Sequence, residues 1–202
     1  MLHHERIRPP HDDYTPDEWN LIEKAFHSEF VAQTESLFAL GNGYLGMRGV
    51  PEEGDPSVQN GTFINGFYEE WPIVYSETAY GFARTGQTML NVTDSKVIRL
   101  FVDDEPFSVA STNIRHYDRR LNLKAGTLDR ELHWETPSGK LVRIRTRRLV
   151  SFRHRHVAAI INSIILVRAA DVPSGMRSNQ WTRSGLSSNS SSTRALAWGV
   201  SF

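Results

Sequence analysis

The alternation of hydrophobic and polar residues predicts a β-rich domain from about residue 61 onward. Short runs of Val, Ile, Thr and aromatic residues are separated by Gly, Pro, Asn and Asp, which is typical of strands joined by tight turns. The run at 96–102 predicts one strand, and the residues at 103–106 predict its turn. Strands do not alternate with helices along the chain, so we expect an antiparallel fold rather than a parallel sheet.

The clearest expected element is a β-hairpin at 127–149 with its loop at 137–139. Apolar residues share one face of each strand, and charged residues share the opposite face. A slip of one residue would place apolar side chains opposite charged ones, so the pattern predicts the register as well as the hairpin. The expected cross-strand pairs are Trp134 with Val142, Leu132 with Ile144, Glu131 with Arg145, and Asp129 with Arg147.

A cluster of basic residues lies in and after the second strand of this hairpin. Its members are Arg143, Arg145, Arg147, Arg148, Arg153, His154, Arg155 and His156. A nucleic-acid patch is disfavoured, because basic and acidic residues balance at 23 each and no aromatic stacking surface is interleaved. His154 and His156 share strand parity, but without a third ligand nearby they do not predict a metal site. We interpret the cluster as a solvent-exposed face whose acids come from the partner strand.

The two ends of the chain differ in character from its middle. Residues 1–14 form a polar lead-in, and Thr15-Pro16-Asp17-Glu18 has the pattern of a helix start, which suggests a helix at 16–24. The β domain is expected to span 15–170. Residues 171–202 form a serine-rich tail without acids or lysines after Asp171, which is typical of disorder.

Composition narrows the class of protein. The length of 202 residues suits one domain, and the 39% hydrophobic content can supply its core. The absence of cysteine excludes disulfides and thiolate metal sites and suits a reducing compartment. No apolar run is long enough to cross a bilayer, and the first residues lack the apolar core of a signal peptide. We therefore expect a cytoplasmic protein without a membrane or nucleic-acid partner.

The glycine-rich stretch at 35–49 contains Gly41, Gly43 and Gly46 in the spacing G-x-G-x-x-G. In a dinucleotide-binding loop this spacing follows a strand and begins a helix. The residues that follow cannot form that helix, because glycine and proline recur through 47–56. The glycines instead predict tight turns and the close approach of another backbone or a ligand.

An aromatic-rich segment follows at 61–82. Flat apolar rings with polar edges suit the faces of sugar rings, although Phe63, Phe67 and Phe82 are expected to fill the core. The residues alone therefore predict a β domain with an irregular edge rich in aromatic residues and glycine.

These segments together resemble glycoside hydrolase family 65, the family of maltose, trehalose and kojibiose phosphorylases. The stretch ESLFALGNGYLGMRG at 35–49 is similar to that family's E-[ST]-L-F-x-L-G-N-G-x-x-G-x-R-G opening. The likeness extends over about 17–160 and is carried by 61–92, 102–107, 125–140 and 145–160.

The resemblance implies a large antiparallel β-sandwich of the galactose-mutarotase-like type, which argues against the helix at 16–24. In the family this domain precedes a catalytic (α/α)6 barrel, and the reaction is inverting phosphorolysis of an α-glucoside disaccharide. A Glu general acid protonates the leaving oxygen while inorganic phosphate attacks from the opposite face, and some members use water instead. The resemblance also implies a homodimer and no metal or organic cofactor. Residues 61–92 point to the maltose subgroup.

The chain departs from the family pattern after about residue 160. The barrel has no counterpart here, so we expect a truncated sandwich that is inactive alone, without a catalytic residue. A shift of reading frame in a longer gene is a hypothesis for the serine-rich tail. The alternative is a free-standing carbohydrate-binding module.

Six residues of these segments are candidates for a substrate rim or a contact between domains: Asn42, Tyr44, Arg48, Asn65, Tyr68 and Trp71. Of these, Arg48 and Asn65 are the polar groups expected to reach a sugar or the barrel.

Overall fold

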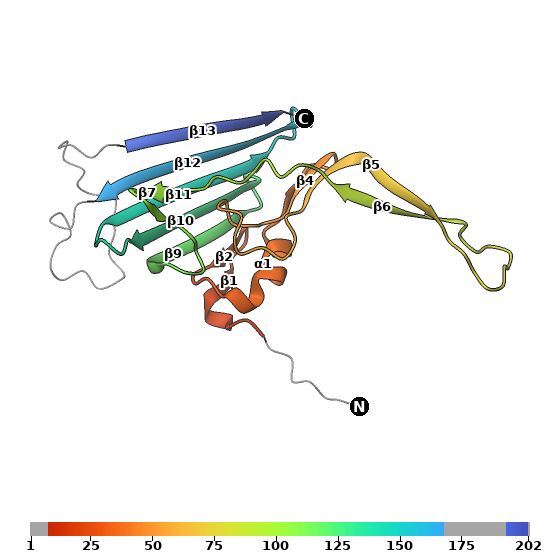
Figure 1. The fold of residues 1–202 in the computed structure, drawn as a ribbon, viewed down its shortest axis with the longest axis horizontal. Coiled ribbons are helices and arrows are strands. Elements are labelled where there is room, and N and C mark those ends of the chain that lie inside the picture. The colour runs from red at the N-terminus through yellow and green to blue at the C-terminus, as the bar shows by residue number, and fades with distance from the viewer. Residues whose placement is uncertain (1–7, 168–192, 202) are drawn as a thin grey trace.

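The computed structural model describes residues 8–167 and 193–201, and most of them form antiparallel strands (Figure 1). A seven-stranded sheet has the strand order β1-β2-β9-β10-β11-β12-β13. Its strands are β1 (Tyr14–Pro16), β2 (Asn20–Glu23), β9 (Asn113–Asn122), β10 (Thr127–Glu135), β11 (Leu141–Val150), β12 (Val157–Val167) and β13 (Thr193–Ser201). This mainly antiparallel β architecture confirms the expected fold class.

A smaller sheet of four strands crosses one end of the large sheet and continues away from it as a hairpin, the β5–β6 arm (Figure 1). Two short strands pair with each other in a separate sheet. One short helix precedes β1, and two lie between β2 and the first strand of the smaller sheet. The smaller sheets contain β3 (Leu40–Gly41), β4 (Leu45–Met47), β5 (Thr62–Pro72) and β6 (Thr85–Asn91), and then β7 (Phe101–Val102) and β8 (Glu105–Pro106). The helices are the 3-10 turns η1 (His11–Asp13) and η2 (Ser28–Phe30) and the α-helix α1 (Val31–Leu37).

The predicted hairpin is present in the predicted register. Strands β10 and β11 pair so that Trp134 lies opposite Val142, Leu132 opposite Ile144, Glu131 opposite Arg145, and Asp129 opposite Arg147. The apolar residues of these pairs are buried, and the charged ones form ion pairs on the outer face. The alternation of side chains therefore determines both the pairing and the face that is buried.

Two other expectations are wrong. Residues 16–24 form no helix, because the Asp17 carboxylate accepts the backbone N–H groups of Trp19 and Asn20 and turns the chain from β1 into β2. The run at 96–102 is mostly irregular, and only Phe101–Val102 is a strand. The first part of this run bonds to the segment 48–53 instead of to a strand, because Ile98 donates its N–H to the Glu52 carbonyl at 2.6 Å. The turn after it is confirmed at Asp103, where φ is 53°.

The C-terminal segment partly differs from the expected disorder. Strand β13 pairs with β12 over its whole length, from Thr193 opposite Ile165 to Ser201 opposite Val157. The rest of the expected tail, 171–192 and 202, lies outside the described residues.

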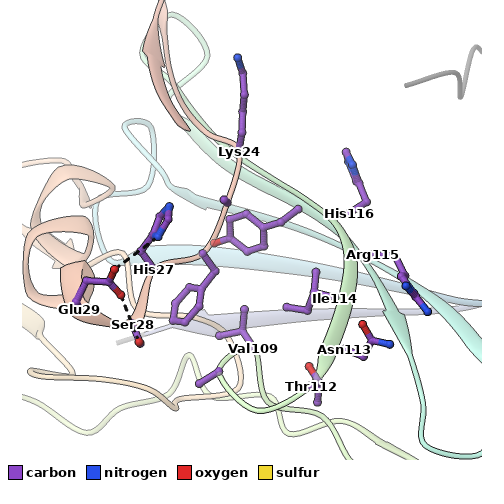
Figure 2. A pocket seen from close by; sticks show the side chains of 14 residues that line it. Lys24, His27, Ser28, Glu29, Val109, Thr112, Asn113, Ile114, Arg115 and His116 are labelled. Carbon is purple, nitrogen blue, oxygen red and sulfur yellow. Dashed lines mark hydrogen bonds and ion pairs between the residues drawn. The ribbon is translucent and has the colours of Figure 1, made fainter. Parts of the chain in front are cut away.

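One edge of the large sheet opens into a cleft. Among the described residues, β2 pairs with β9 only from Arg119 to Asn122, and the chain then diverges from β9 after Glu23. The cleft of about 570 Å³ lies between residues 24–29 and 109–117 (Figure 2). Val109 and Ile114 lie at its floor, while Lys24, Arg115 and His116 point away from its middle (Figure 2).

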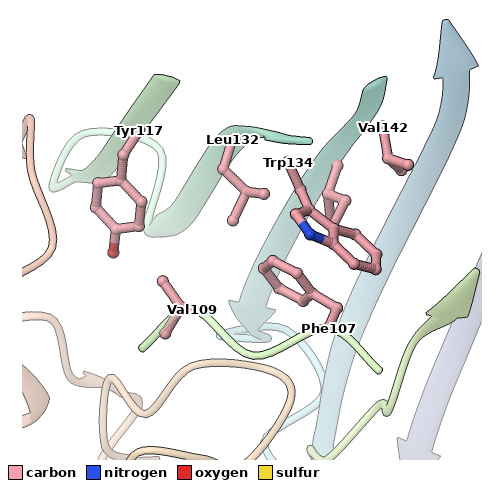
Figure 3. Close-up of a cluster of buried hydrophobic side chains, with 7 residues drawn as sticks. Phe107, Val109, Tyr117, Leu132, Trp134 and Val142 are labelled. Carbon is pink, nitrogen blue, oxygen red and sulfur yellow. The ribbon is translucent and has the colours of Figure 1, made fainter. Parts of the chain in front are cut away.

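The main core lies on the inner face of the large sheet. Trp134 and Phe107 pack with their ring centroids 5.2 Å apart, and both belong to a cluster of buried side chains (Figure 3). That cluster contains Phe107, Val109, Tyr117, Leu132, Trp134, Val142 and Ile144. A second cluster joins the two larger sheets, because Leu45, Met47 and Ile64 of the smaller sheet pack against Val150 and Ala158. This packing fixes the base of the arm on the body of the domain.

Within the described ranges, no helix is long and apolar enough to cross a membrane.

Candidate functional site

The glycine-rich stretch forms a turn that Asn42 ties to the large sheet. The Asn42 amide donates to the carbonyl oxygens of Ser151 and Arg155, at 2.6 and 2.9 Å, in the connection between β11 and β12. Its side-chain oxygen accepts the backbone N–H groups of Tyr44 and Leu45 at 2.9 and 2.8 Å. Gly43 follows with φ of 84°, which a residue with a side chain rarely adopts. Asn42 therefore shapes the turn and is occupied by protein partners.

Tyr44, Asn65 and Tyr68 form a small polar group beside this turn. Asn65 donates its backbone N–H to the Tyr44 carbonyl at 2.8 Å, and the Tyr68 hydroxyl donates to the Asn65 side-chain oxygen. The Arg155 guanidinium lies 4.8 Å from the centre of the Tyr44 ring. The structure thus brings Asn42, Tyr44, Asn65 and Tyr68 together at the base of the arm. Asn65 and Tyr68 are exposed there.

Arg48, by contrast, points into the domain. It forms an ion pair of 3.2 Å with Glu35, which is the buried first residue of the glycine-rich motif. The Glu35 carboxylate also accepts the backbone N–H groups of Val58 and Gln59 at 2.7 and 3.1 Å. Gly61 leaves room for Arg48, since a Cβ there would lie 2.1 Å from Arg48 Cδ. Glu35 thus holds the segment 57–61, and Arg48 pairs with its buried carboxylate, a role that the motif's spacing alone does not indicate.

Trp71 lies farther out, on the β5–β6 arm. All residues at 65–85 except Ile73 are exposed, including the aromatic ones at the arm's far end. Phe67 and Phe82 are 54% and 50% exposed, so the expectation that they fill the core is wrong, while Phe63 is half-buried. The reason is that the arm extends beyond the large sheet and packs only its base, at Thr62 and Ile64, against the body (Figure 1).

Three buried arginines of the large sheet hold the segment 48–53, a role that the sequence interpretation assigned to none of them. Arg130 binds Glu53 through two nitrogens at 3.0 and 2.8 Å and also contacts Glu52 at 2.8 Å. Arg148 contacts Glu52 at 2.9 Å and donates to the Val50 carbonyl at 3.0 Å. Arg119 donates to the Gly49 carbonyl at 2.9 Å. These side chains therefore fix the path of the chain that leaves the glycine-rich turn.

The assignment of Arg148 to a solvent-exposed cluster is wrong, because it is 1% exposed. Strand parity could have shown this: Arg148 shares its face of β11 with Val142, Ile144 and Val150. The exposed position of Arg145, Arg147 and residues 153–156 is confirmed, while Arg143 is half-buried.

The electrostatics of this network favour charged side chains. Burial alone would raise the pKa of Glu52, but the guanidinium groups of Arg130 and Arg148 lower it to about 2. For the Arg130 guanidinium, burial acts against the charge and is outweighed by Glu52 and Glu53, which raise its pKa. Nearby, Arg119 pairs with Glu23 at 2.8 Å, and burial together with Glu23 raises the pKa of the Tyr117 hydroxyl. The site is therefore an ionic frame rather than a proton-transfer site.

The cleft of Figure 2 contains none of the six candidate residues. At its rim, burial and the neighbouring His133 lower the pKa of His116, so its imidazole favours the neutral form. In the part of the chain that the structure describes, no group of three His, Asp or Glu side chains is placed to hold a metal ion.

The sequence matches a family model, "Glycosyl hydrolase family 65, N-terminal domain", over residues 21–197. It is 46% identical over 151 residues to an α,α-trehalose phosphorylase of Thermoanaerobacter brockii, covering 73% of this chain and 20% of that protein. An uncharacterised glycosyl hydrolase of Mycobacterium tuberculosis is also 46% identical, over 74% of this chain and 19% of its own length. A kojibiose phosphorylase of Halothermothrix orenii is 29% identical, over 74% of this chain and 18% of its own length.

The fold has a solved counterpart. A structure from the human microbiome, provisionally described as a kojibiose phosphorylase, superposes with a TM-score of 0.67 at 25% identity, over 76% of this chain and 20% of that one. The chain thus spans about a fifth of the length of the curated relatives it matches.

Proposed function

Because the chain belongs to glycosyl hydrolase family 65, whose N-terminal domain it matches over residues 21–197, we propose that it serves an inverting α-glucoside phosphorylase as its N-terminal β-sandwich. The observation that carries the proposal is the 46% identity to a trehalose phosphorylase over most of this chain but only 20% of that protein. In this proposal a separate catalytic part supplies the general acid and the phosphate site. No residue described here is assigned to the bond-breaking step.

The exposed arm supports a role in contact with that catalytic part. An isolated two-stranded hairpin is at best marginally stable in water, and this one exposes Phe67, Trp71 and Phe82 beyond the body of the domain. The polar group at its base is held rigidly, since Asn42 and Asn65 are both fixed by hydrogen bonds. We propose that the arm and the glycine-rich turn border the catalytic part and the rim of its sugar site.

The proposed substrate is an α-linked glucose disaccharide, cleaved with inorganic phosphate as co-substrate and without a metal or organic cofactor. Trehalose has the strongest support, because the trehalose phosphorylase of Thermoanaerobacter brockii is more similar than the kojibiose phosphorylase of Halothermothrix orenii. The maltose expected from residues 61–92 has no counterpart among the relatives named above and becomes a third sugar to assay. A homodimer and a cytoplasmic location are further parts of the proposal.

The test uses the pure chain and a separately produced catalytic part of the Thermoanaerobacter brockii enzyme. The chain is incubated with phosphate and trehalose, kojibiose or maltose, and glucose 1-phosphate is measured. We expect no product from the chain alone and co-sedimentation of the two parts when they are mixed. Product formation by the chain alone would contradict the proposal, and so would the absence of any association between the parts.

A carbohydrate-binding module is the second candidate, favoured by one observation. Trp71 presents a 43% exposed indole on strand β5, outside the clusters of the domain core. Binding of sugar by the chain, together with no association between the chain and the catalytic part, would support this function.

A further inference from the structure

The Trp71 side chain lies against the backbone of the neighbouring strand. Trp71 of β5 is directly opposite Gly86 of β6. A Cβ built on Gly86 would lie 2.5 Å from Cε2, 2.6 Å from Cζ2 and 2.7 Å from Nε1 of the indole. Three ring atoms at nearly equal distance from one point indicate that the indole lies over Gly86. The absence of a side chain at residue 86 is therefore what allows the ring to rest on the strand.

The opposite side of the indole is open. Trp71 is 43% exposed although one side of its ring is covered by Gly86. The covering strand also limits the rotamers of Trp71, so a ligand that stacks on the ring would immobilise little further. Flat, partly covered rings of this kind present an apolar surface with a polar N–H at the edge.

Hydrogen-bonding groups share this face of the arm. Glu69 and Thr88 are opposite each other. Glu69 lies two residues before Trp71 in β5, and Thr88 lies two residues after Gly86 in β6. Because side chains two residues apart share one face, the Glu69 carboxylate and the Thr88 hydroxyl project from the same face of the arm as the indole. Both residues are exposed. The face thus combines an apolar platform with an acceptor and a hydroxyl that donates or accepts.

We infer that Trp71, Glu69 and Thr88 form a sugar-binding subsite that takes one ring of an α-glucoside. The C–H face of a pyranose would stack on the indole, and ring hydroxyls would bond to Glu69 and Thr88. A protein surface is less well matched, because the carboxylate next to the ring would need a partner of its own when buried. The inference rests on the proposed function for the choice of α-glucosides, and it concerns binding rather than catalysis.

Gly86 offers a test that leaves the indole in the sequence. Gly86→Ala places a methyl group where the ring now lies, and φ at Gly86 is not in the left-handed region, so backbone strain does not confuse the result. Trp71→Ala removes the platform, and Trp19→Ala removes an indole of similar exposure, 45%, at a distant turn.

The experiment titrates the ¹⁵N-labelled chain with trehalose, kojibiose and maltose, and follows the indole N–H signal that Trp71→Ala removes. At least one sugar is expected to shift that signal and leave the Trp19 signal in place. Trp71→Ala and Gly86→Ala should each weaken binding of that sugar about tenfold, and the control Trp19→Ala should bind as the parent does. The remaining amide spectrum shows that each variant is folded.

An unshifted Trp71 indole in the folded parent with all three sugars would overturn the inference, and so would unchanged binding by Trp71→Ala or Gly86→Ala. Because no catalytic part is present, these outcomes concern the subsite alone. They leave the proposed association with a catalytic part to its own sedimentation test.

Discussion

Replacing Glu52 by Gln tests whether the buried ionic frame holds the domain together. Glu52 is 3% exposed and contacts Arg130 at 2.8 Å and Arg148 at 2.9 Å. Glu52→Gln keeps the size of the side chain but removes its charge, and two buried guanidinium groups lose a partner. Removal of one partner from a buried ion pair costs about 3–5 kcal/mol.

The pKa of Glu52 gives an independent magnitude. It falls from an ordinary value of 4.5 to about 2 in the folded protein. Such a depression corresponds to about 3 kcal/mol of stability, which is present above pH 4.5 and lost as the pH falls toward 2. The parent and Glu52→Gln should therefore differ by about 3 kcal/mol at pH 7, and their difference should shrink below pH 4.5.

Urea unfolding, followed by near-ultraviolet circular dichroism at pH 7 and at steps down to pH 2.5, measures both effects. In a thermal scan at pH 7, followed by the same signal, the melting temperature of Glu52→Gln should fall by about 6–12 °C. The control is Glu131→Gln, because Glu131 pairs with Arg143 and Arg145 on the outer face and should contribute only roughly 0–1 kcal/mol. Equal, small losses in both variants would refute the reasoning, as would a difference that does not depend on pH.

Three further predictions concern the glycine-rich turn and the arm. Gly49→Ala should lower the free energy of unfolding by about 1–3 kcal/mol, because its Cβ would lie 2.6 Å from Phe38 Cβ; urea unfolding checks this, and a loss no larger than that of Gly46→Ala would contradict it. Asn42→Ala should cost about 2 kcal/mol and speed amide exchange at Tyr44 and Leu45, whose N–H groups it now binds; unchanged exchange would show that the turn does not depend on Asn42. The double variant Tyr75→Ser, Phe82→Ser should reduce the fluorescence of a bound hydrophobic dye, since these exposed rings pack with their centroids 4.9 Å apart on the arm. A reduction equal to that of Leu123→Ser, which removes an exposed leucine elsewhere, would argue against the arm as the dye site.

The features that could be predicted from the sequence are local ones. The hairpin of β10 and β11 depends on residues within one short stretch, where apolar and charged positions alternate and match across a three-residue loop. The prediction that the glycine-rich turn is not a dinucleotide loop is also confirmed, since a strand and not a helix begins at Leu45. In both cases neighbouring residues carry the information.

The features that could not be predicted depend on distant partners. Strand parity predicts the burial of Arg148, but it does not predict the partner of the charge, because Glu52 lies far away in the sequence. The run at 96–102 has strand-forming residues, but Lys96 is buried and bonds to Asp94, Asn60 and Thr62, which draws the chain away from a sheet. The arm is a further case, because the aromatic residues that suggest a core lie beyond the body of the domain.

The same limit applies to the six candidate residues. Four of them lie together at the base of the arm, and of these only the proximity of Asn42 and Tyr44, which are neighbours in the turn, could be anticipated. The inward path of Arg48 could not be, because it depends on Glu35 and on the space left by Gly61.

The central claim, that this domain serves a family-65 phosphorylase, is tested most directly by a chimera. Residues 21–167 of this chain replace the matching segment of the Thermoanaerobacter brockii trehalose phosphorylase, to which the chain is 46% identical. Release of glucose 1-phosphate from trehalose and phosphate is then measured against the parent enzyme and against this chain alone. The account predicts phosphorolysis by the chimera and none by the chain alone. A folded chimera without activity, or release of glucose 1-phosphate by the chain alone, would contradict it.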